Sequence, residues 1–280
     1  MQDSTRQTLE TGTDELIAEI DSQVAIVTLN RPQARNALSD NLSPALRRLI
    51  PRLADDANVR SLLITGAGSA FCAGGDVKGM GAGNGGKTPE APRTREEVVE
   101  DLCVRQLTLT GALYHFPKPT LAALPGPAAG AGLSIALACD LRIAAKSAFV
   151  TTAFANIGLS GDYGASFFLT QLVGTARARE LFYGAERLDA ERCEELGIVN
   201  RVVPDEQLRP EALAWARKLA SGPTVAYRQM KENLDRALRE DLATCLAGEA
   251  AGLVESASTG DHREAVRAFV EKRKPEFNGR

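Results

Sequence analysis

Two glycine-rich segments of this chain offer backbone N–H groups that can hold a developing negative charge. Gly74 and Gly75 follow the apolar run 60–65, and the segment Gly126–Gly132 lies between another apolar run and a helical pattern. Glycine lets the backbone turn sharply and come close to a ligand, and N–H groups at the start of a helix face negative charge. Two such amides aimed at one carbonyl oxygen form an oxyanion hole, which stabilises an enolate.

Each segment also has a purely structural explanation. A simple turn accounts for Gly74 and Gly75 equally well. Small residues in Gly126–Gly132 also allow a helix to pack closely on a strand. The glycines alone therefore leave both interpretations open.

A third glycine-rich segment imitates a nucleotide-binding loop. Gly81–Thr88 match the pattern G-x-x-x-x-G-K-[ST]. The mechanism of that loop requires a strand before it and a helix after it, so that the helix N-terminus faces phosphate. Pro89 and Pro92 oppose a helix at this point, and residues 77–80 do not have the pattern of a buried strand. We therefore predict a surface loop here rather than a triphosphate site.

Short apolar runs alternate with helical patterns as far as residue 204. Leu16–Ile20 and Val24–Leu29 flank Asp21-Ser22-Gln23 and predict a hairpin. Helical spacing follows Ser39, which is a favourable N-cap. The later pattern predicts strands at 60–65, 121–124 and 141–145, and helices at 94–114 and up to about 138. This alternation predicts crossover units and an α/β fold.

The pattern changes after Pro204. Helical periodicity marks residues 213–219, 225–238, 242–254 and 263–272, with no strand pattern between them. We therefore divide the chain into a core at 1–204, which carries the site, and a helical C-terminal region at 205–280.

Composition and charge argue against several functional classes. The chain has 280 residues, 44% hydrophobic and 25% charged, which is ordinary for a globular protein. A formal charge of -3 provides no broad basic surface for nucleic acid. No apolar stretch is long enough to span a bilayer, and the polar N-terminus lacks a secretory signal. We expect a cytoplasmic protein without nucleic-acid or membrane partners.

Cysteine and histidine usage argues against a metal site. The five cysteines are scattered without a C-x-x-C pair, and the chain contains only two histidines. We therefore expect no metal and no disulfide framework, and free thiols in a reducing compartment.

Six segments in matching order resemble the enoyl-CoA hydratase/isomerase (crotonase) superfamily, from about Ile17 to Phe277. They read LNRPQARNALS (29–39), LLITGAGSAFCAGGDVKGM (62–80), PKPTLAALPGPAAGAGLSIALACDLRIAAKSAFV (117–150), NIGLSGDYGASFFLTQLVG (156–174), ERLDAERCEELGIVNRVV (186–203) and REAVRAFVEKRKPEF (263–277). The resemblance implies an acyl-CoA substrate and a crotonase-like spiral of repeated ββα units with a helical C-terminal trimerisation region. The pattern of site residues is most similar to that of the phenylacetate-pathway enoyl-CoA isomerases.

In this family two backbone amides hold the thioester oxygen, and the matching positions here are Gly75 and Ala131. Every residue except proline has a backbone N–H, so alanine in place of glycine at 131 is a tolerable departure. The resemblance also implies CoA contacts at the pocket edge and from a helix of the neighbouring subunit in a trimer. The matching residues are Ala34, Arg35, Ala73, Asp76, Val77, Lys78, Phe269 and Lys272. For Lys272, a solvated charge on a helix face is the alternative.

The two glutamates that hydratases of this family use are missing. Ser134 stands at one position, and Ala153 or Phe154 at the other, depending on where a one-residue insertion is placed. None of these side chains can exchange a proton. Ordinary water addition, which needs a positioned acid/base, is therefore in doubt.

One carboxylate remains well placed, that of Asp162. In the phenylacetate-pathway isomerases and in some dehalogenating relatives, an aspartate at the matching position acts on the substrate. A buried carboxyl among apolar side chains has a raised pKa, which suits proton transfer. The expected neighbours are Phe154, Ile157, Leu159 and Phe167. The alternative is a helix N-cap, because Asp162 precedes the helical run 163–172.

The leading hypothesis is an enoyl-CoA isomerase in which Asp162 moves a proton while the amides of Gly75 and Ala131 hold the enolate. Water addition to a 2-enoyl-CoA through Asp162 is the second hypothesis, and a catalytically degenerate acyl-CoA-binding trimer is the third. The helix at 96–114 is expected to form the acyl pocket. No cofactor is implied beyond the CoA of the thioester substrate, and the expected assembly is a homotrimer or a hexamer of two trimers.

Overall fold

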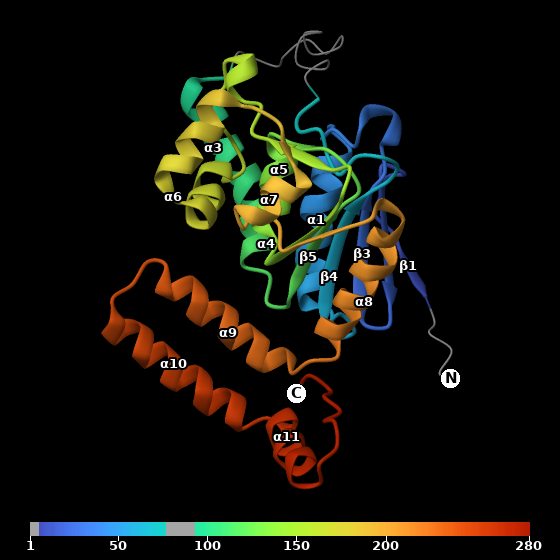
Figure 1. Ribbon diagram of the computed structural model, residues 1–280, viewed down its shortest axis with the longest axis vertical. Coiled ribbons are helices and arrows are strands. Elements are labelled where there is room, and N and C mark those ends of the chain that lie inside the picture. Colours follow the sequence, from blue (N-terminus) through green and yellow to red (C-terminus); the bar gives the residue numbers. More distant parts are fainter. Residues whose placement is uncertain (1–5, 77–92) are drawn as a thin grey trace.

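A seven-stranded sheet forms the centre of the molecule (Figure 1). The computed structural model describes residues 6–76 and 93–280. In spatial order the strands are β1 (Gln7–Leu9), β2 (Leu16–Asp21), β3 (Val24–Leu29), β4 (Ser61–Gly66), β5 (Thr120–Leu124), β7 (Leu141–Ala145) and β10 (Arg201–Val203). β1, β2 and β3 pair antiparallel, and the pairs from β3 to β10 are parallel. Because parallel strands require crossover connections, the predicted α/β fold is confirmed.

A smaller sheet joins β6 (Ala128–Ala129), β8 (Phe149–Thr151) and β9 (Leu188–Asp189). β6 pairs parallel with β8, and β8 pairs antiparallel with β9. The sequence does not predict these strands, because two or three residues are too few to show an alternating pattern. β6 ends shortly before α5 (Ala131–Ala138) and so fixes the start of that helix.

Helices alternate with the strands along the chain as far as β10. They are α1 (Leu42–Asp55), α3 (Arg95–Gln106), α4 (Ala112–Tyr114), α5, α6 (Ala165–Gly184) and α7 (Ala190–Glu195). Single 3₁₀ turns occupy Pro32–Ala34 (η1), Ala155–Ile157 (η3) and Asp205–Gln207 (η4), and a π-helical turn occupies Leu107–Gly111 (η2). The predicted helix at 94–114 thus consists of α3, η2 and α4 in succession. Within the described ranges, no helix is both long and apolar enough to cross a lipid bilayer.

α5 is buried on every side. All eight of its residues are buried, which is typical of a helix that is apolar around its whole circumference. It packs against α6, η2 and β6. Ser134 is the only residue of α5 with a polar side chain, and it is fully buried. A buried hydroxyl needs a partner, so its contacts bear on the site.

Gly132 lets α5 approach the segment that leads to Asp76. A Cβ built on Gly132 would lie 2.2 Å from the carbonyl oxygen of Cys72. No side chain fits at that distance, so close packing, the structural explanation for the second glycine-rich segment, holds at this position.

Four helices follow β10. α8 (Leu208–Ala220) packs on β4 and β5, and Ser61 Oγ donates a hydrogen bond to the carbonyl of Ala216 at 2.9 Å. α9 (Thr224–Ala237), α10 (Leu242–Ala257) and α11 (Gly260–Val270) form an arm at one end of the molecule (Figure 1). The predicted helices after Pro204 are therefore present. Because α8 packs on the sheet, the arm begins with α9.

Buried charges fasten the last residues of the chain to the core. Arg60 donates to the carbonyl of Phe277 at 2.9 Å. Asp261 accepts the N–H groups of Asn278 and Gly279 at 2.7 and 2.9 Å. Both charged side chains are buried, and these hydrogen bonds tie α11 to the segment that follows it.

Replacing Gly132 by alanine tests the contact of α5 with the Cys72 carbonyl. The added methyl must displace that carbonyl or the helix, and overpacking of this kind costs about 1–3 kcal/mol of unfolding free energy. Denaturant unfolding of Gly132→Ala measures the loss. Gly184→Ala is the matched control, because its added Cβ would meet its nearest atom at 3.7 Å. An equal loss in both variants would show that the contact does not constrain α5.

Candidate active site

The two glycine-rich segments lie against one another. Phe71 and Cys72 donate their N–H groups to the carbonyl of Pro127, at 3.0 and 3.2 Å, and Ala129 donates to the carbonyl of Cys72 at 3.0 Å. All three hydrogen bonds join main-chain groups, as part of a parallel bridge between Cys72 and Ala128. They hold the segment before Asp76 at a fixed place beside the segment before α5.

Gly74 brings the junction to its closest approach. Its φ of +93° lies where residues with a side chain are strained. A Cβ at this position would stand 2.8 Å from the carbonyl oxygen of Ala129 and 3.5 Å from the nitrogen of Ala131. Only glycine satisfies both conditions. Because Gly74 comes so close to the nitrogen of Ala131, the next residue, Gly75, lies beside the start of α5.

The N–H groups of Gly75 and Ala131 are unused donors at this junction. Among the hydrogen bonds between residues that the structure describes, none takes its hydrogen from either group. Ala131 opens α5, where the first N–H groups have no acceptor within the helix and the helix dipole adds positive potential. Burial of α5 keeps that potential from being screened by water. The structure thus brings the two predicted donors to one junction.

The segment around η1 lies along the same edge. Ala73 donates to the carbonyl of Arg35 at 3.0 Å, and Leu38 donates to the carbonyl of Gly74 at 2.8 Å. Asp76 returns a hydrogen bond to the carbonyl of Leu38 at 3.3 Å. Three main-chain bonds therefore place the predicted CoA-contacting residues Ala34, Arg35, Ala73 and Asp76 side by side.

Asn36 organises this edge, and the sequence did not single it out. Its side chain is fully buried, donates to the carbonyls of Ala67 and Ala70 at 3.0 and 2.8 Å, and accepts the N–H of Arg31 at 2.8 Å. Its φ of 57° is one that asparagine tolerates better than most residues. An asparagine shortly after the strand-breaking Asn30-Arg31-Pro32 was the available signal.

Arg31 brings a positive charge to Asp76. Its guanidinium lies 3.2 Å from Asp76 Oδ2 and 3.5 Å from Glu15 Oε1, and it donates to the carbonyl of Ala37 at 2.6 Å. The cation therefore links Glu15, the residue before β2, and the η1 segment to the first glycine-rich segment. Its ion pair with Asp76 helps to hold the main chain next to Gly75 at this edge.

Two predicted site residues, Val77 and Lys78, lie outside the described residues. The P-loop-like segment Gly81–Thr88 lies there too, so the surface loop predicted for it remains a prediction.

Phe269 and Lys272 lie far from this junction in the single chain. Both are exposed, Phe269 to 85%, at the end of α11. In Figure 1, α11 lies at the opposite end of the molecule from α5. One chain does not bring these two residues to Gly75 and Ala131. A contact with CoA from them therefore requires a second copy of the chain.

The N-cap interpretation of Asp162 is wrong. α6 begins at Ala165, its N-cap is Gly164, and no side chain caps it. Asp162 Oδ1 is buried and has no hydrogen-bond partner within the part of the chain that the structure describes. Burial raises the pKa of this carboxyl to about 6, because the charged form loses hydration without gaining a partner.

Two stacked aromatic rings lie beside Gly161, the residue before Asp162. Phe154 and Phe182 lie 5.9 Å apart with an interplanar angle of 17°. A Cβ on Gly161 would meet the Phe182 ring at 3.1 Å, and one on Gly130 would meet the Phe154 ring at 3.6 Å. The ring pair therefore spans from the loop of Asp162 to the loop of Ala131.

The apolar neighbours predicted for Asp162 differ in burial. Phe154 is buried, but Ile157, Leu159 and Phe167 are 50%, 52% and 39% exposed. Phe182 lies beside the preceding Gly161, and it belongs to the second half of α6, twenty residues further along the chain than Asp162. No local pattern links Phe182 to Asp162, which is why the sequence did not reveal it.

Ser134 stands where the resemblance expects a glutamate of hydratases. Its hydroxyl lies 3.1 Å from the carbonyl oxygen of Asp162 and 3.2 Å from that of Gly130. Ala153 and Phe154, the candidates for the second glutamate position, carry no ionisable group. Near the junction, Asp162 is thus the carboxyl whose pKa allows it to exchange protons close to neutral pH.

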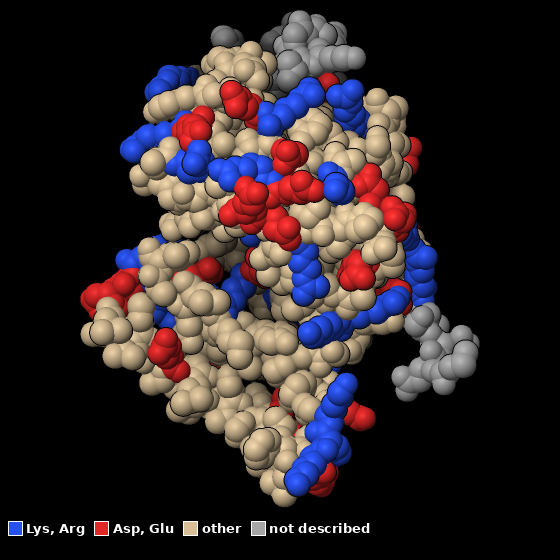
Figure 2. All heavy atoms as spheres, viewed as in Figure 1, with Lys and Arg blue, Asp and Glu red and all other residues tan. Residues whose placement is uncertain are grey.

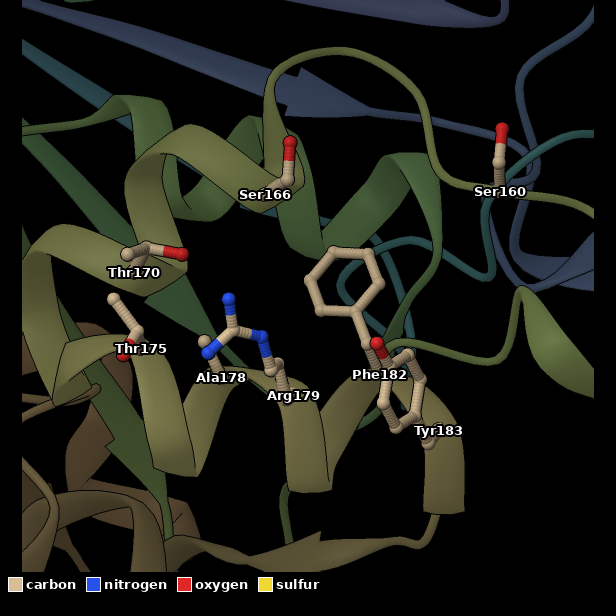
Figure 3. A pocket seen from close by; sticks show the side chains of 8 residues that line it. All are labelled: Ser160, Ser166, Thr170, Thr175, Ala178, Arg179, Phe182 and Tyr183. Carbon is tan, nitrogen blue, oxygen red and sulfur yellow. The ribbon is translucent and has the colours of Figure 1, made fainter.

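A hydroxyl-lined pocket runs along α6 (Figure 3). The helix bends at Gly174, whose φ and ψ of 74° and 166° are not helical, and side chains from both halves surround the pocket. Its volume is about 270 Å³, and its lining residues are Ser160, Ser166, Thr170, Thr175, Ala178, Arg179, Phe182 and Tyr183. Ser160 from the loop of Asp162 lines this pocket together with Phe182, so the pocket adjoins that loop.

A larger cavity of about 490 Å³ lies between the core and α9, where Figure 2 shows a hollow between the body of the molecule and the arm. Tyr114 and Phe168 line its core side, and Met230 and Leu234 line it from α9. The predicted acyl-pocket helix reaches this cavity through Tyr114 alone. The other residues of α3 and η2 do not line it.

The chain is similar to known proteins over nearly all of its length. A model of the family described as "Enoyl-CoA hydratase/isomerase" matches residues 19–280. A Rhodobacter capsulatus protein named "Probable enoyl-CoA hydratase" is 38% identical over 94% of this chain and 97% of its own. The "1,2-epoxyphenylacetyl-CoA isomerase" of Escherichia coli is 35% identical, covering 95% of this chain and 98% of its own.

A solved structure has the same fold. The crystal structure of an enoyl-CoA hydratase from Polaromonas sp. JS666 matches with a TM-score of 0.85 and 34% identity, over 94% of this chain and 99% of the other. The resemblance of the six sequence segments is therefore confirmed, and the α/β core is that of crotonase-fold enzymes. The chain belongs to the enoyl-CoA hydratase/isomerase family, the crotonase superfamily, and is an enzyme of that family.

Proposed function

We propose that this enzyme moves a double bond within an enoyl-CoA thioester. The thioester carbonyl accepts hydrogen bonds from the N–H groups of Gly75 and Ala131, which form the oxyanion hole. Removal of a proton next to the conjugated system gives an enolate, whose negative oxygen these two donors stabilise. The unused amides at the junction of the two loops support this role.

Asp162 is the single acid/base of the proposed reaction. Its ionised form removes a proton from the α- or γ-carbon, and its protonated form returns that proton at the other end of the shifted double bond. A pKa of about 6 leaves the carboxylate ionised at neutral pH and still basic enough to accept a proton. This raised pKa of a carboxyl without a partner among the described residues is the observation that carries the proposal.

The two oxyanion donors contribute more than the acid/base. Removal of one such donor costs about 3–4 kcal/mol in enzymes where it has been measured. A positioned general acid or base contributes about 10²–10⁴-fold, which is roughly 3–5 kcal/mol. Two amides therefore exceed one carboxyl, and the rigid main-chain junction that holds Gly75 and Ala131 is the main catalytic device.

The CoA portion of the substrate lies along the η1 edge in this proposal. Ala34, Arg35, Ala73 and Asp76 expose main-chain and side-chain groups there. The reaction uses no cofactor besides the CoA that the substrate carries, because a proton transfer next to a thioester requires none.

Water addition is the second candidate, and the name of the Rhodobacter capsulatus relative favours it. A hydratase would need Asp162 to activate water without either family glutamate, since Ser134 and Phe154 cannot do so. A degenerate acyl-CoA-binding protein is the third possibility. Three assays separate them: double-bond migration in a 3-enoyl-CoA, water addition to a 2-enoyl-CoA, and acyl-CoA binding without turnover.

Replacing Asp162 by asparagine removes the acid/base at nearly constant volume. We expect double-bond migration to slow by at least about 100-fold, with acyl-CoA affinity nearly unchanged, in kinetic and equilibrium binding assays. In the wild type, kcat/KM should fall as the pH drops through about 6, because the free enzyme needs the ionised base. Asp55→Asn, an exposed carboxylate at the end of α1, is the matched control. Wild-type activity in Asp162→Asn would remove Asp162 from the mechanism.

The raised pKa of Asp162 also predicts a pH-dependent cost in stability. The pKa of Asp162 is about 6 in the folded state and about 3.9 in the unfolded state. The stability that proton binding by Asp162 gives the folded state is therefore complete below about pH 3.9, and it is lost as pH rises through about 6. We expect Asp162→Asn to melt at a higher temperature than the wild type at pH 8, with the gap closing near pH 4. Thermal unfolding across this range measures it, and a gap that does not change with pH would contradict the prediction.

We also propose a homotrimer, or a hexamer of two trimers, assembled through the arm. Large apolar side chains on the arm are exposed, among them Leu253 at 71% and Val270 at 74%, and such clusters mark protein interfaces. Light scattering should give three or six times the chain mass. Leu253→Asp should lower that mass, while Lys218→Asp on α8 should leave it unchanged. A wild-type monomer would refute the assembly.

A further inference from the structure

The peptide group that follows Asp162 is held from two sides. Its oxygen accepts a hydrogen bond from Ser134 Oγ in α5 at 3.1 Å. Its N–H, which belongs to Tyr163, donates to Gln106 Oε1 at the end of α3 at 2.7 Å. A peptide group is a rigid plane, so bonds at both ends fix its orientation. The Cα of Asp162 lies in this plane, so the point from which its side chain leaves the backbone is anchored as well.

The backbone around this peptide needs such support. Tyr163 has a φ of 49°, and Gly161 and Gly164 on either side of the Asp162–Tyr163 pair have φ values of 115° and 79°. A tyrosine avoids the left-handed region unless surrounding contacts impose it. The bonds from Ser134 and Gln106 are contacts of this kind, and both come from other elements of the fold.

The contact of Ser134 with Asp162 has no local explanation. A serine within a helix is usually satisfied by the carbonyl four residues earlier, and Gly130 offers that carbonyl at 3.2 Å. The hydroxyl has one hydrogen to donate, and it also reaches across to the loop of Asp162. Since Gly130 directly precedes Ala131, one buried hydroxyl joins the loop of the proposed oxyanion donor to the loop of the proposed base.

We propose that Ser134 and Gln106 are positioning residues that aim the carboxyl of Asp162 at the substrate carbon beside Ala131. The proposal deepens the proposed function and rests on it. Ser134 stands at the position of a hydratase glutamate but does not exchange a proton. It holds the peptide group of Asp162, whose carboxyl exchanges the proton.

Neither positioning residue carries a charge, so replacing them changes geometry without adding or removing one. The charged and titratable groups that act on the neighbouring Tyr163 are Asp162 itself, Arg47 of α1 and Arg105 of α3. All of these remain in place when Ser134 or Gln106 is replaced. A change in activity can then be traced to the position of the carboxyl.

The first test is the kinetics of Ser134→Ala and Gln106→Met. Each substitution removes one bond to the peptide group, and misplacement of a reacting group by about 1 Å costs about 100-fold in rate. We expect kcat to fall about 10- to 100-fold with KM for the enoyl-CoA nearly unchanged. Ser134→Thr, which keeps the hydroxyl, should restore most of the rate. Unchanged kcat in both Ser134→Ala and Gln106→Met would overturn the proposal.

A matched control separates positioning from packing. Ser61 is buried and donates to the carbonyl of Ala216 at 2.9 Å, the same kind of bond at a place remote from Asp162 in the fold. Ser61→Ala should lose stability as Ser134→Ala does, but keep the wild-type kcat. An equal fall in kcat in both variants would mean that Ser134 serves stability alone.

A double substitution tests whether Ser134 acts through Asp162. In an Asp162→Asn background there is no carboxyl to aim, so Ser134→Ala should cause little further loss of the residual rate. A second loss as large as in the wild-type background would assign Ser134 a role independent of Asp162 and overturn the proposal.

A readout without turnover keeps this test separate from the proposed function. Carbon NMR of the aspartate carboxyls, with Asp162 assigned by its loss in Asp162→Asn, should show a pKa of about 6 in the wild type. In Ser134→Ala the pKa should move toward the ordinary aspartate value, because a released loop admits water to the carboxyl. A wild type that moves no double bond refutes the proposed function. The titration then decides the positioning role separately. An unchanged pKa of Asp162 in Ser134→Ala and Gln106→Met overturns the positioning role.

Discussion

Main-chain hydrogen bonds between two loops are the interaction on which the rest of this structure depends. Phe71, Cys72 and Ala129 join the segments before Asp76 and before α5 through peptide groups alone. Such bonds place backbone amides more rigidly than side chains could, because peptide groups have no rotamers to lose. This arrangement restricts two positions to glycine. An added Cβ would lie 2.8 Å from a carbonyl oxygen at Gly74 and 2.2 Å from one at Gly132, so the junction leaves no room for a side chain there. An enolate site made of N–H groups requires this kind of rigidity.

The carboxyl of Asp162 differs from this junction in its hydrogen bonding. Main-chain hydrogen bonds hold the junction together, whereas Asp162 Oδ1 is buried without a partner among the residues that the structure describes. Burial raises the pKa of Asp162 to about 6, which is the range that proton transfer needs, and the stacked rings of Phe154 and Phe182 lie beside the preceding Gly161. A carboxyl of this kind lowers the stability of the folded protein, which is a common cost of catalytic groups. Side-chain hydrogen bonds of Ser134 and Gln106 hold the peptide group that follows Asp162, although Oδ1 of the carboxyl itself has no partner among the described residues.

In the proposed assembly, the residues predicted to bind CoA come from two places in the fold. The η1 edge and the two glycine-bearing loops belong to one core, whereas Phe269 lies exposed at the far end of α11 (Figure 1). The apolar cavity of about 490 Å³ between the core and α9 shows that the arm also contributes surface to the interior of its own chain. A single polypeptide therefore contains all the residues of the proposed reaction, but Phe269 lies away from them. This arrangement links acyl-CoA binding to the proposed trimer.

The sequence by itself determined the parts that depend on local chemistry. The hairpin around Ser22 and Gln23, the alternation of strands and helices, and the two glycine-rich turns follow from turn residues and from periodicity. The family followed from motifs in matching order, and so did the hypothesis that Asp162 is the acid/base. Only the tertiary structure decided that Asp162 does not cap α6 and that its peptide is held by Ser134 and Gln106, which lie 28 and 57 residues away from their partners in the chain. Contacts over such separations leave no period or spacing in the sequence, because they depend on how the helices pack and not on the residues beside them.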